Sequence, residues 1–180
     1  FNDDDIFSIF LNNNFMDTIV VGIDFSKSSL TAMKVSIDIA ARANADLHIV
    51  WVETVEMPYD KAEEKLKEYA NKAKEKLNNS EAYYHILPKG KVYLILNKAI
   101  KEFDADLLVV GTHGNSGYDE KFAGANTYKT ITEAHCPVLT IREDFHTDKD
   151  LEVLIMPIDF TKDTRQKVPW TIEFAQIPDM

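Results

Sequence analysis

A glycine-rich loop contains the residues whose types and spacing best suit the binding of an anion. It begins with Gly111-Thr112-His113-Gly114, continues for nine residues, and ends at Gly124-Ala125-Asn126. Glycines let the backbone adopt positive φ and approach a ligand closely. The apolar run Asp106–Val110 precedes the loop, and we expect a helix to begin at Gly124, with its first N–H groups pointing at an anion. This order of strand, loop and helix predicts a cradle for phosphate groups.

The chain carries no familiar catalytic arrangement. It has no Walker A, C-x-x-C, H-E-x-x-H or G-x-S-x-G motif, and Thr112-His113-Gly114 does not complete the H-x-G-H signature of nucleotidyltransferases of similar architecture. His48 has no ligand partner nearby in the sequence, and Trp51 and Trp170 are expected in the core. We therefore expect no fast catalysis and no protein-bound metal. Slow ATP hydrolysis stays open as a hypothesis without an identified base.

Short apolar runs alternate with helical patterns along the chain, and they predict the frame that positions the loop. Strands are expected at 18–24, 46–52, 82–87, 106–110 and 137–141, and helices at 28–43, 58–77, 92–103 and from about 124 to 134. This alternation predicts a three-layer α/β fold, with a five-stranded parallel sheet and helices on both faces. Right-handed crossovers leave few topologies for such a sheet, and among them we expect the order 3-2-1-4-5. In such sheets a ligand binds beyond the carboxyl ends of the strands, where the winding reverses. The expected walls of that crevice are Gly22–Asp24 and Val110–Thr112.

The acidic composition narrows the classes of partner. A net charge of −10 disfavours nucleic-acid backbones, although backbone N–H groups can still hold a small anion. No apolar run approaches the roughly 18 residues of a membrane span. The single cysteine, Cys136, excludes an internal disulfide and is expected to be a buried structural thiol. We therefore expect a cytoplasmic protein that binds a small molecule rather than nucleic acid or a membrane.

The first fifteen residues differ from the rest of the chain. Residues 1–15 (FNDDDIFSIFLNNNF) show no clear period and precede Met16, which stands directly before the first expected strand. Two interpretations stay open for them. They are either a foreign upstream extension from a misassigned start or a natural disordered tail.

An internal repeat follows the central domain. Ile158-Asp159-Phe160 restates Ile23-Asp24-Phe25, and a helical pattern follows in both places. We interpret residues 151–180 as the first strand and helix of a truncated second copy, and residues 143–150 as a polar linker. Such a piece cannot bury its own apolar faces. It is therefore either a fragment of a tandem protein, which we favour, or a segment that packs on the first domain.

Three segments together resemble the universal stress protein family. The pattern of Gly-x-x-Gly, nine residues and Gly resembles the phosphate-binding signature of its ATP-binding members. Ile19–Ser26 (IVVGIDFS) resembles the family's first strand and turn, and His135–Leu139 (HCPVL) resembles its final helix-to-strand passage. The resemblance covers residues 16–142, and the repeat resembles the start of the partner domain in two-domain members. It implies an ATP-binding stress-response sensor or regulator.

The resemblance also implies a role for each residue of the site. Asp24 would contact the adenine or the ribose, although it could instead cap the first helix or brace its turn. The backbone of Val52 would contact the base. The residues implied to line the ribose and phosphates are Gly111, His113 and Gly114, and those implied to hold the outer phosphates are Gly124, Ala125 and Asn126. Mg²⁺ is expected only where the nucleotide carries it.

One position departs from the family pattern. Members that bind ATP usually have Ser or Thr directly after the last glycine, where this chain has Ala125. Losing a hydroxyl that bonds a charged oxygen costs about 1.5–3 kcal/mol, which is roughly a ten- to hundredfold loss of affinity. A second hypothesis is therefore an interaction module that has lost nucleotide binding. The resemblance implies that it would form a homodimer, or a pseudo-dimer with a second copy, through Val138–Ile141.

Overall fold

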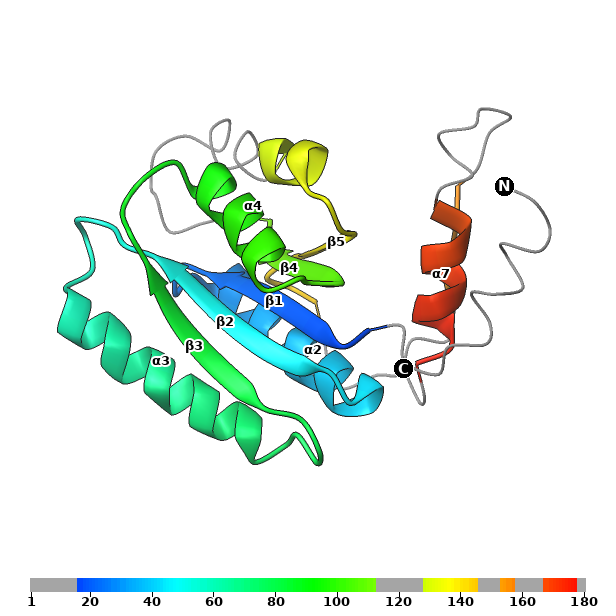
Figure 1. Ribbon diagram of the computed structural model, residues 1–180, viewed down its shortest axis with the longest axis horizontal. Helices are drawn as coiled ribbons and strands as arrows, with labels where there is room; N and C mark the ends of the chain where they lie inside the picture. The colour runs from blue at the N-terminus through cyan, green and yellow to red at the C-terminus, as the bar shows by residue number, and fades with distance from the viewer. Residues whose placement is uncertain (1–15, 113–127, 146–152, 158–166, 178–180) are drawn as a thin grey trace.

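A computed structural model describes residues 16–112, 128–145, 153–157 and 167–177 (Figure 1). Its strands are β1 (Thr18–Ile23), β2 (Asp46–Val52), β3 (Ala82–Leu87), β4 (Leu107–Gly111) and β5 (Val138–Ile141). Its helices are α2 (Lys27–Ala43), α3 (Tyr59–Lys74), α4 (Val92–Glu102) and α7 (Lys167–Ala175), and residues 128–133 are also helical. Within the part of the chain that the structure describes, no helix has the length and apolarity to cross a lipid bilayer.

All five strands form one parallel sheet in the order β3-β2-β1-β4-β5, which confirms the predicted order. The central strand β1 pairs with β2 on one side and with β4 on the other. Because the strands are parallel, the carboxyl ends of β1, β2 and β4 lie at the same edge of the sheet. The winding reverses between β1 and β4, which is where the sequence analysis expects the crevice.

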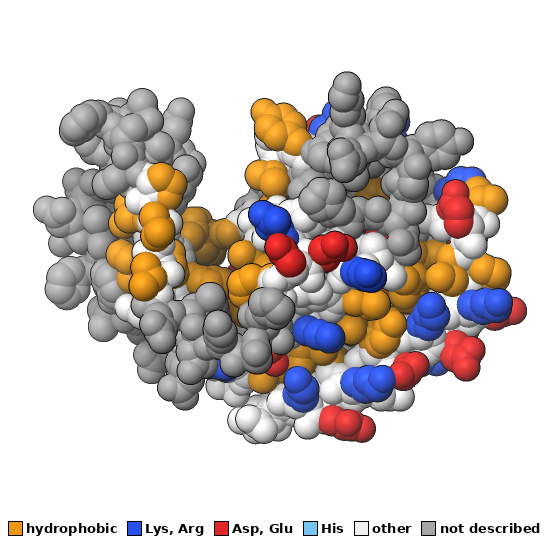
Figure 2. Space-filling view, turned by 180° about the vertical axis from the view of Figure 1, so that it is seen from behind, with side chains coloured by type: hydrophobic (Ala, Val, Ile, Leu, Met, Phe, Trp, Pro, Cys, Tyr) orange, Lys and Arg blue, Asp and Glu red, His pale blue; other side chains and the backbone are white. Residues whose placement is uncertain are grey.

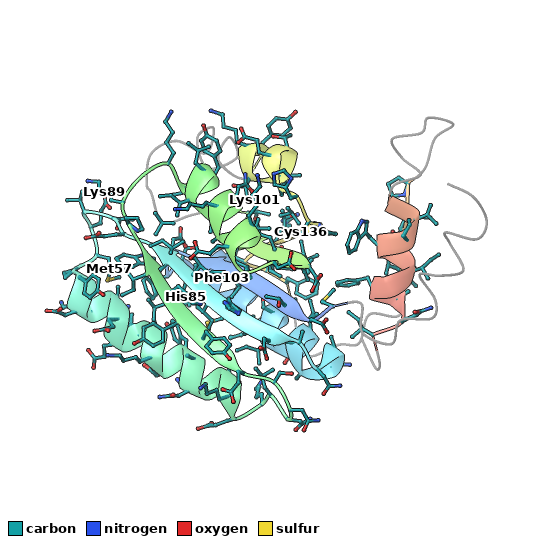
Figure 3. All side chains as sticks on the ribbon, in the orientation of Figure 1. Met57, His85, Lys89, Lys101, Phe103 and Cys136 are labelled. Atoms are coloured by element: carbon teal, nitrogen blue, oxygen red, sulfur yellow. The ribbon has the colours of Figure 1, made fainter. Side chains whose placement is uncertain are left out.

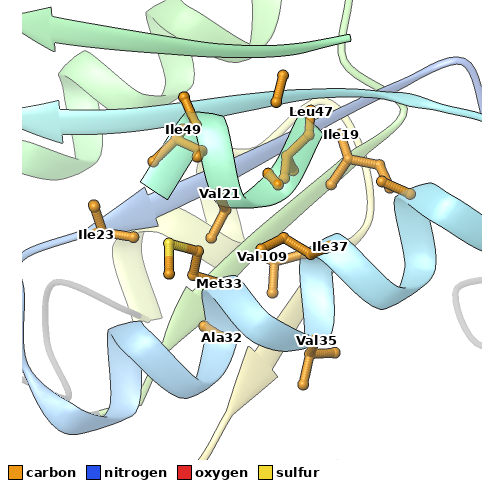
Figure 4. Close-up of a cluster of buried hydrophobic side chains, with 14 of the residues drawn as sticks. Ile19, Val21, Ile23, Ala32, Met33, Val35, Ile37, Leu47, Ile49 and Val109 are labelled. Carbon is orange, nitrogen blue, oxygen red and sulfur yellow. The ribbon is translucent and has the colours of Figure 1, made fainter. Parts of the chain in front are cut away.

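Hydrophobic cores cover both faces of the sheet. The larger core lies between the sheet and helices α2 and α3, and it contains Ile19 and Val21 of β1 together with Met33 of α2 (Figure 4). On the opposite face α4 packs Leu96 against a cluster that includes Val20 of β1. Successive residues of β1 therefore enter different cores, which explains its unbroken apolar sequence. The helices on both faces complete the three predicted layers (Figure 1).

Local signals explain where α2 begins and ends. The Ser26 hydroxyl accepts a hydrogen bond from the Ser29 N–H at 3.2 Å, so Ser26 is the N-cap. At the other end Asn44 adopts a left-handed conformation with φ 55°, and its N–H donates to the Ala40 carbonyl. These two caps fix the ends of α2, whose N-terminus follows the carboxyl end of β1.

The segment after the central domain departs from the sequence prediction. Residues 153–157 have no regular secondary structure, although the repeat predicted a strand from Leu154. A strand needs a neighbour to pair with, and in the described residues none pairs there. The helix α7 does form, and Phe174 and Ile177 pack against the larger core. Trp170 was expected in the core but is 42% exposed, because one helix cannot enclose its indole ring.

Candidate functional site

Three of the eight predicted site residues lie at one edge of the sheet. Asp24 follows β1, Val52 ends β2 and Gly111 ends β4. The parallel register pairs Ile23 with the last-but-one residue of β2, and Gly22 with the last-but-one residue of β4. Asp24, the next residue along the chain after Ile23, therefore lies beside Val52 and next to the end of β4. The remaining predicted residues lie outside the described part of the chain: His113, Gly114, Gly124, Ala125 and Asn126.

Asp24 shapes the turn that joins β1 to α2. Its Oδ1 accepts a hydrogen bond from the Ser26 N–H at 3.0 Å, and its own N–H donates to the Ser29 hydroxyl at 3.2 Å. The Ser29 hydroxyl also donates to the Ser26 carbonyl at 3.1 Å. Asp24 therefore braces its turn, one of the roles that the sequence left open. A contact with a ligand would be an additional role.

Phe25, inside the same turn, has a left-handed backbone with φ 64°. For a residue with a Cβ this conformation costs roughly 1–2 kcal/mol. Ring contacts offset the cost: its ring centroid is 6.0 Å from that of Trp51 and 6.3 Å from that of Tyr69. The Lys65 ammonium also lies 5.1 Å from the centroid of the Phe25 ring. These contacts fix the backbone that presents Asp24 at the crevice.

Gly111 allows β4 to touch the first turn of α2. A Cβ at this position would lie 2.7 Å from both the Ser28 hydroxyl and the Ser29 nitrogen. Such distances are too short for any side chain, so packing alone requires a glycine here. The same close approach sets the positive end of the α2 dipole beside the crevice, where it favours an anion.

A second polar cluster, which the sequence analysis missed, lies on the α4 face of β2 and β3. His48 Nδ1 is 3.0 Å from His85 Nε2, and the two ring planes differ by 7° with centroids 5.0 Å apart. Because the nitrogens are much closer than the centroids, the rings meet edge to edge in an N–H···N hydrogen bond. Phe103 packs against both rings, with centroid distances of 4.5 and 4.4 Å (Figure 3).

The surroundings of this histidine pair lower the pKa of both imidazoles. Burial is the larger cause for His48, the charge of His85 adds to it, and Asp46 opposes it. Burial also lowers the pKa of His85, and Glu102 opposes that shift. The histidines are 37 residues apart in the chain, so only the register of β2 and β3 could have revealed the pair.

The single cysteine lies away from the predicted site residues in the sequence, after the glycine-rich loop. Burial raises the pKa of the half-buried Cys136 thiol to about 11, which keeps it protonated and unreactive. Among the residues that the structure describes, no three His, Cys, Asp or Glu side chains group together as metal ligands.

Comparison with known sequences identifies one family. The model of the universal stress protein family matches residues 16–142. A universal stress protein of Methanocaldococcus jannaschii is 27% identical over 147 residues, covering 72% of this chain and 84% of that protein. One from Mycobacterium tuberculosis is 31% identical over 135 residues, covering 71% of this chain and 48% of that protein. The match thus spans about half the length of the mycobacterial relative.

Solved structures share the fold. A universal stress protein in complex with cAMP is 29% identical with a TM-score of 0.57, covering 72% of this chain and 98% of that chain. UspA from Lactobacillus plantarum is 19% identical with a TM-score of 0.58, covering 71% and 98%. A universal stress protein from Archaeoglobus fulgidus in complex with dAMP is 19% identical with a TM-score of 0.53, also covering 71% and 98%. At 19% identity the last two show the fold alone.

Proposed function

The chain belongs to the universal stress protein family, and from this premise we propose that it binds an adenine nucleotide at the carboxyl ends of β1, β2 and β4. The observation that carries the proposal is the 29% identical structure, which holds cAMP and aligns over 98% of its length. The crevice also lies where the winding of the sheet reverses, as ligand sites in open α/β sheets do. The nucleotide we propose is ATP, with Mg²⁺ present only as its counterion.

The roles we propose within the site follow from its position in the fold. Asp24 would contact the adenine or ribose, and the Val52 backbone would contact the base; the strand register, which sets the two side by side, supports this. Gly111 would line the ribose, close to the N-terminus of α2. The other proposed residues lie outside the described part of the chain: His113 and Gly114 would line the ribose and phosphates with Gly111, and Gly124, Ala125 and Asn126 would hold the outer phosphates.

We assign this protein the role of a cytoplasmic stress-response sensor or regulator rather than that of a fast enzyme. The chain lacks the familiar catalytic motifs, so turnover would be slow hydrolysis at most. Occupancy of the crevice would instead change a surface that partners recognise.

Replacing Ala125 with Ser tests the phosphate end of the proposed site. The restored hydroxyl should tighten ATP binding roughly ten- to hundredfold, because a hydrogen bond to a charged oxygen contributes about 1.5–3 kcal/mol. The affinity for adenosine, which has no phosphate, should stay the same. Isothermal titration calorimetry of both chains with both ligands measures these changes.

A pair of matched variants controls for the adenine end. Asp24→Asn keeps an oxygen that can accept the Ser26 N–H but removes the charge, and it should weaken ATP and adenosine alike. Asp46→Asn removes the same charge at the amino end of β2, far along the strand from the proposed site, where Asp46 Oδ1 accepts the Glu81 N–H. This variant should bind both ligands like the parent. Absence of saturable ATP binding at millimolar concentration in both the parent and A125S would sink the proposal.

A second candidate is an interaction module of the same fold. The described sheet ends at β5, so one side of Val138–Ile141 is open to strand pairing. We propose that this edge pairs with the same strand of another copy, or of a second domain in a longer protein. The mycobacterial relative, about half of which is matched, supports a tandem arrangement with residues 151–180 as the start of the second copy. Sedimentation of a stable dimer with no bound nucleotide would favour this candidate over the first.

A further inference from the structure

The strand β3 is the outermost strand on the side of the described sheet opposite β5. One side of its backbone is open to pairing with a further strand. The carbonyls of Glu81 and Leu87 accept hydrogen bonds from N–H groups of the β2 segment at 2.8 and 2.9 Å. Backbone groups alternate sides along a strand, so those of Ala82, Tyr84 and Ile86 point away from β2. Among the described residues no further strand pairs with them. In the described part of the chain, this edge therefore presents a row of backbone groups that no strand pairs with.

A groove of about 340 Å³ runs between this edge and α3. Its α3 wall is the stripe Lys67, Asn71 and Lys74, whose spacing of four and three residues places them on one side of the helix. Tyr84 belongs to the facing wall of the groove, which is formed by β3. The remaining lining residues are Ala70, Ala82, Tyr83 and His85.

The described lining of the groove includes positively charged side chains, although the net charge of the chain is −10. No carboxylate is among its described lining residues, whereas Lys67 and Lys74 both are. Their ammonium groups pair with Glu63 at 3.1 Å and with Glu81 at 2.9 Å, and all four side chains are substantially exposed. Exposed pairs of this kind are worth only about 0–1 kcal/mol, so the carboxylates of a ligand can replace these partners. Figure 2 shows the mixture of cationic and anionic side chains over the face of the molecule that carries α3.

We propose that an extended acidic peptide segment of a partner protein docks in this groove as a sixth strand beside β3. Its backbone would pair with the open groups of Tyr84 and Ile86, and its carboxylates would meet Lys67 and Lys74. Alternate side chains of a strand are about 7 Å apart, and seven helical residues span about 10 Å. Acidic residues two or four positions apart therefore suit the two lysines.

Charge selects this occupant over a second copy of the chain. Two copies that paired through β3 would bring their lysine stripes toward one another, which repulsion disfavours. The same lysines would protect the edge from uncontrolled association. An acidic strand would instead be attracted to the lysines. The dependence of binding on the sign of the peptide charge therefore distinguishes docking of an acidic peptide from pairing with a second copy.

The test uses the full chain and three synthetic hexapeptides. One alternates Glu and Val, one alternates Lys and Val, and the third is the Glu-Val peptide with N-methylated amides that cannot pair. The Glu-Val peptide should slow amide hydrogen exchange at Tyr84 and Ile86, as measured by NMR. The double variant Lys67→Gln/Lys74→Gln should weaken its binding by at least about tenfold. Lys72→Gln removes a charge from the same helix outside the groove and should bind like the parent.

Several results would overturn the proposal. Equal binding of the Lys-Val or N-methylated peptide would remove the charge or the strand pairing from the explanation. Absence of binding at millimolar Glu-Val peptide would leave the lysines as edge protection alone. Amides at Tyr84 and Ile86 whose protection rises with protein concentration, without peptide, would show that copies of the chain pair here instead. None of these readouts depends on nucleotide binding.

Discussion

Three residues near the carboxyl ends of β1 and β4 have structural roles in the described fold. Asp24 holds the Ser26 N–H, Phe25 keeps a left-handed backbone, and Gly111 admits the first turn of α2. Motif and position predicted a ligand crevice at the carboxyl ends of β1 and β4, and its role in binding stays a prediction. They could not show that each residue also builds it, because those contacts join β1, α2 and β4 in space. A variant at any of the three therefore needs a stability measurement beside the binding measurement.

The histidine pair shows the same limit more sharply. His48 has no partner nearby in the sequence, yet His85 lies within hydrogen-bond distance once β2 and β3 pair in register. Both side chains point to the face opposite α3, which alternation along each strand could indicate only after the register was known. Partners from neighbouring strands stay hidden until the sheet order and register are both fixed.

This pair predicts how stability depends on pH. Each folded pKa lies below the ordinary value of 6.5, so the unfolded chain binds protons first as the pH falls. The contribution of the neutral histidine pair to the free energy of unfolding is therefore fully present above pH 6.5. It is lost as the pH falls from there through the folded pKa values. Urea unfolding between pH 8 and 5 should show this loss in the parent chain and a smaller loss in His85→Gln.

The control for this prediction is Tyr83→Phe, which keeps the ring that contacts His48 at a centroid distance of 4.9 Å. It should follow the parent at every pH. Asp46 and Glu102 oppose the shifts and remain in all three chains. An H85Q chain that loses as much stability as the parent between pH 8 and 5 would contradict the assignment.

Among the elements, apolar patterns predicted each helix and strand that the structure describes between residues 16 and 142. These patterns indicate which side chains are buried, but they do not fix the residue at which a helix ends. The stripe on α3 predicted a helix as far as Leu77, and that side chain is indeed 7% exposed. The helix nevertheless ends at Lys74. The Lys76 N–H then donates to the carbonyl of Ala73, three residues earlier, at 2.9 Å, which makes a tighter turn than that of an α-helix. The strands β2 and β3 have the predicted bounds, helped by Asn44 and Pro88 beside them.

The junction of β4 with α2 predicts the effect of Gly111→Ala. The new methyl group would overlap the backbone of Ser28 and Ser29, so the helix must shift. Overpacking of this kind costs roughly 1–3 kcal/mol, and we expect that loss in the free energy of unfolding by urea. At Gly90→Ala, the control, the closest contact is the flexible tip of Ile95 at 2.9 Å, so the change should be under about 0.5 kcal/mol. Equal losses in the two variants would show that β4 and α2 have room to separate.

For the whole molecule, alternation of strands and helices predicted the parallel sheet and its layers, and it left few possible strand orders. Right-handed crossovers leave few arrangements for five parallel strands, and the observed order is one of them. The segment after the linker could not be treated in this way. Phe174 and Ile177 of this segment pack on the larger core, whereas Val153 and Ile155 are 75% and 83% exposed.

Deleting residues 146–180 separates the two contributions of this C-terminal segment. The five-stranded sheet and both cores should remain, since all their strands precede the deletion. Loss of the Phe174 and Ile177 contacts should lower the free energy of unfolding by about 1–3 kcal/mol. Removal of the exposed run should at the same time reduce self-association, as measured by sedimentation velocity.

A full-length double variant, Leu154→Ser/Ile155→Ser, isolates the second effect. It removes two exposed apolar side chains but keeps α7 on the larger core. Its sedimentation should therefore match that of the truncated chain, while its unfolding free energy should stay within about 0.5 kcal/mol of the parent. If the double variant instead loses as much stability as the truncated chain, residues 153–157 support the first domain itself. The segment would then be part of that domain's packing, and the case for a second copy would fall.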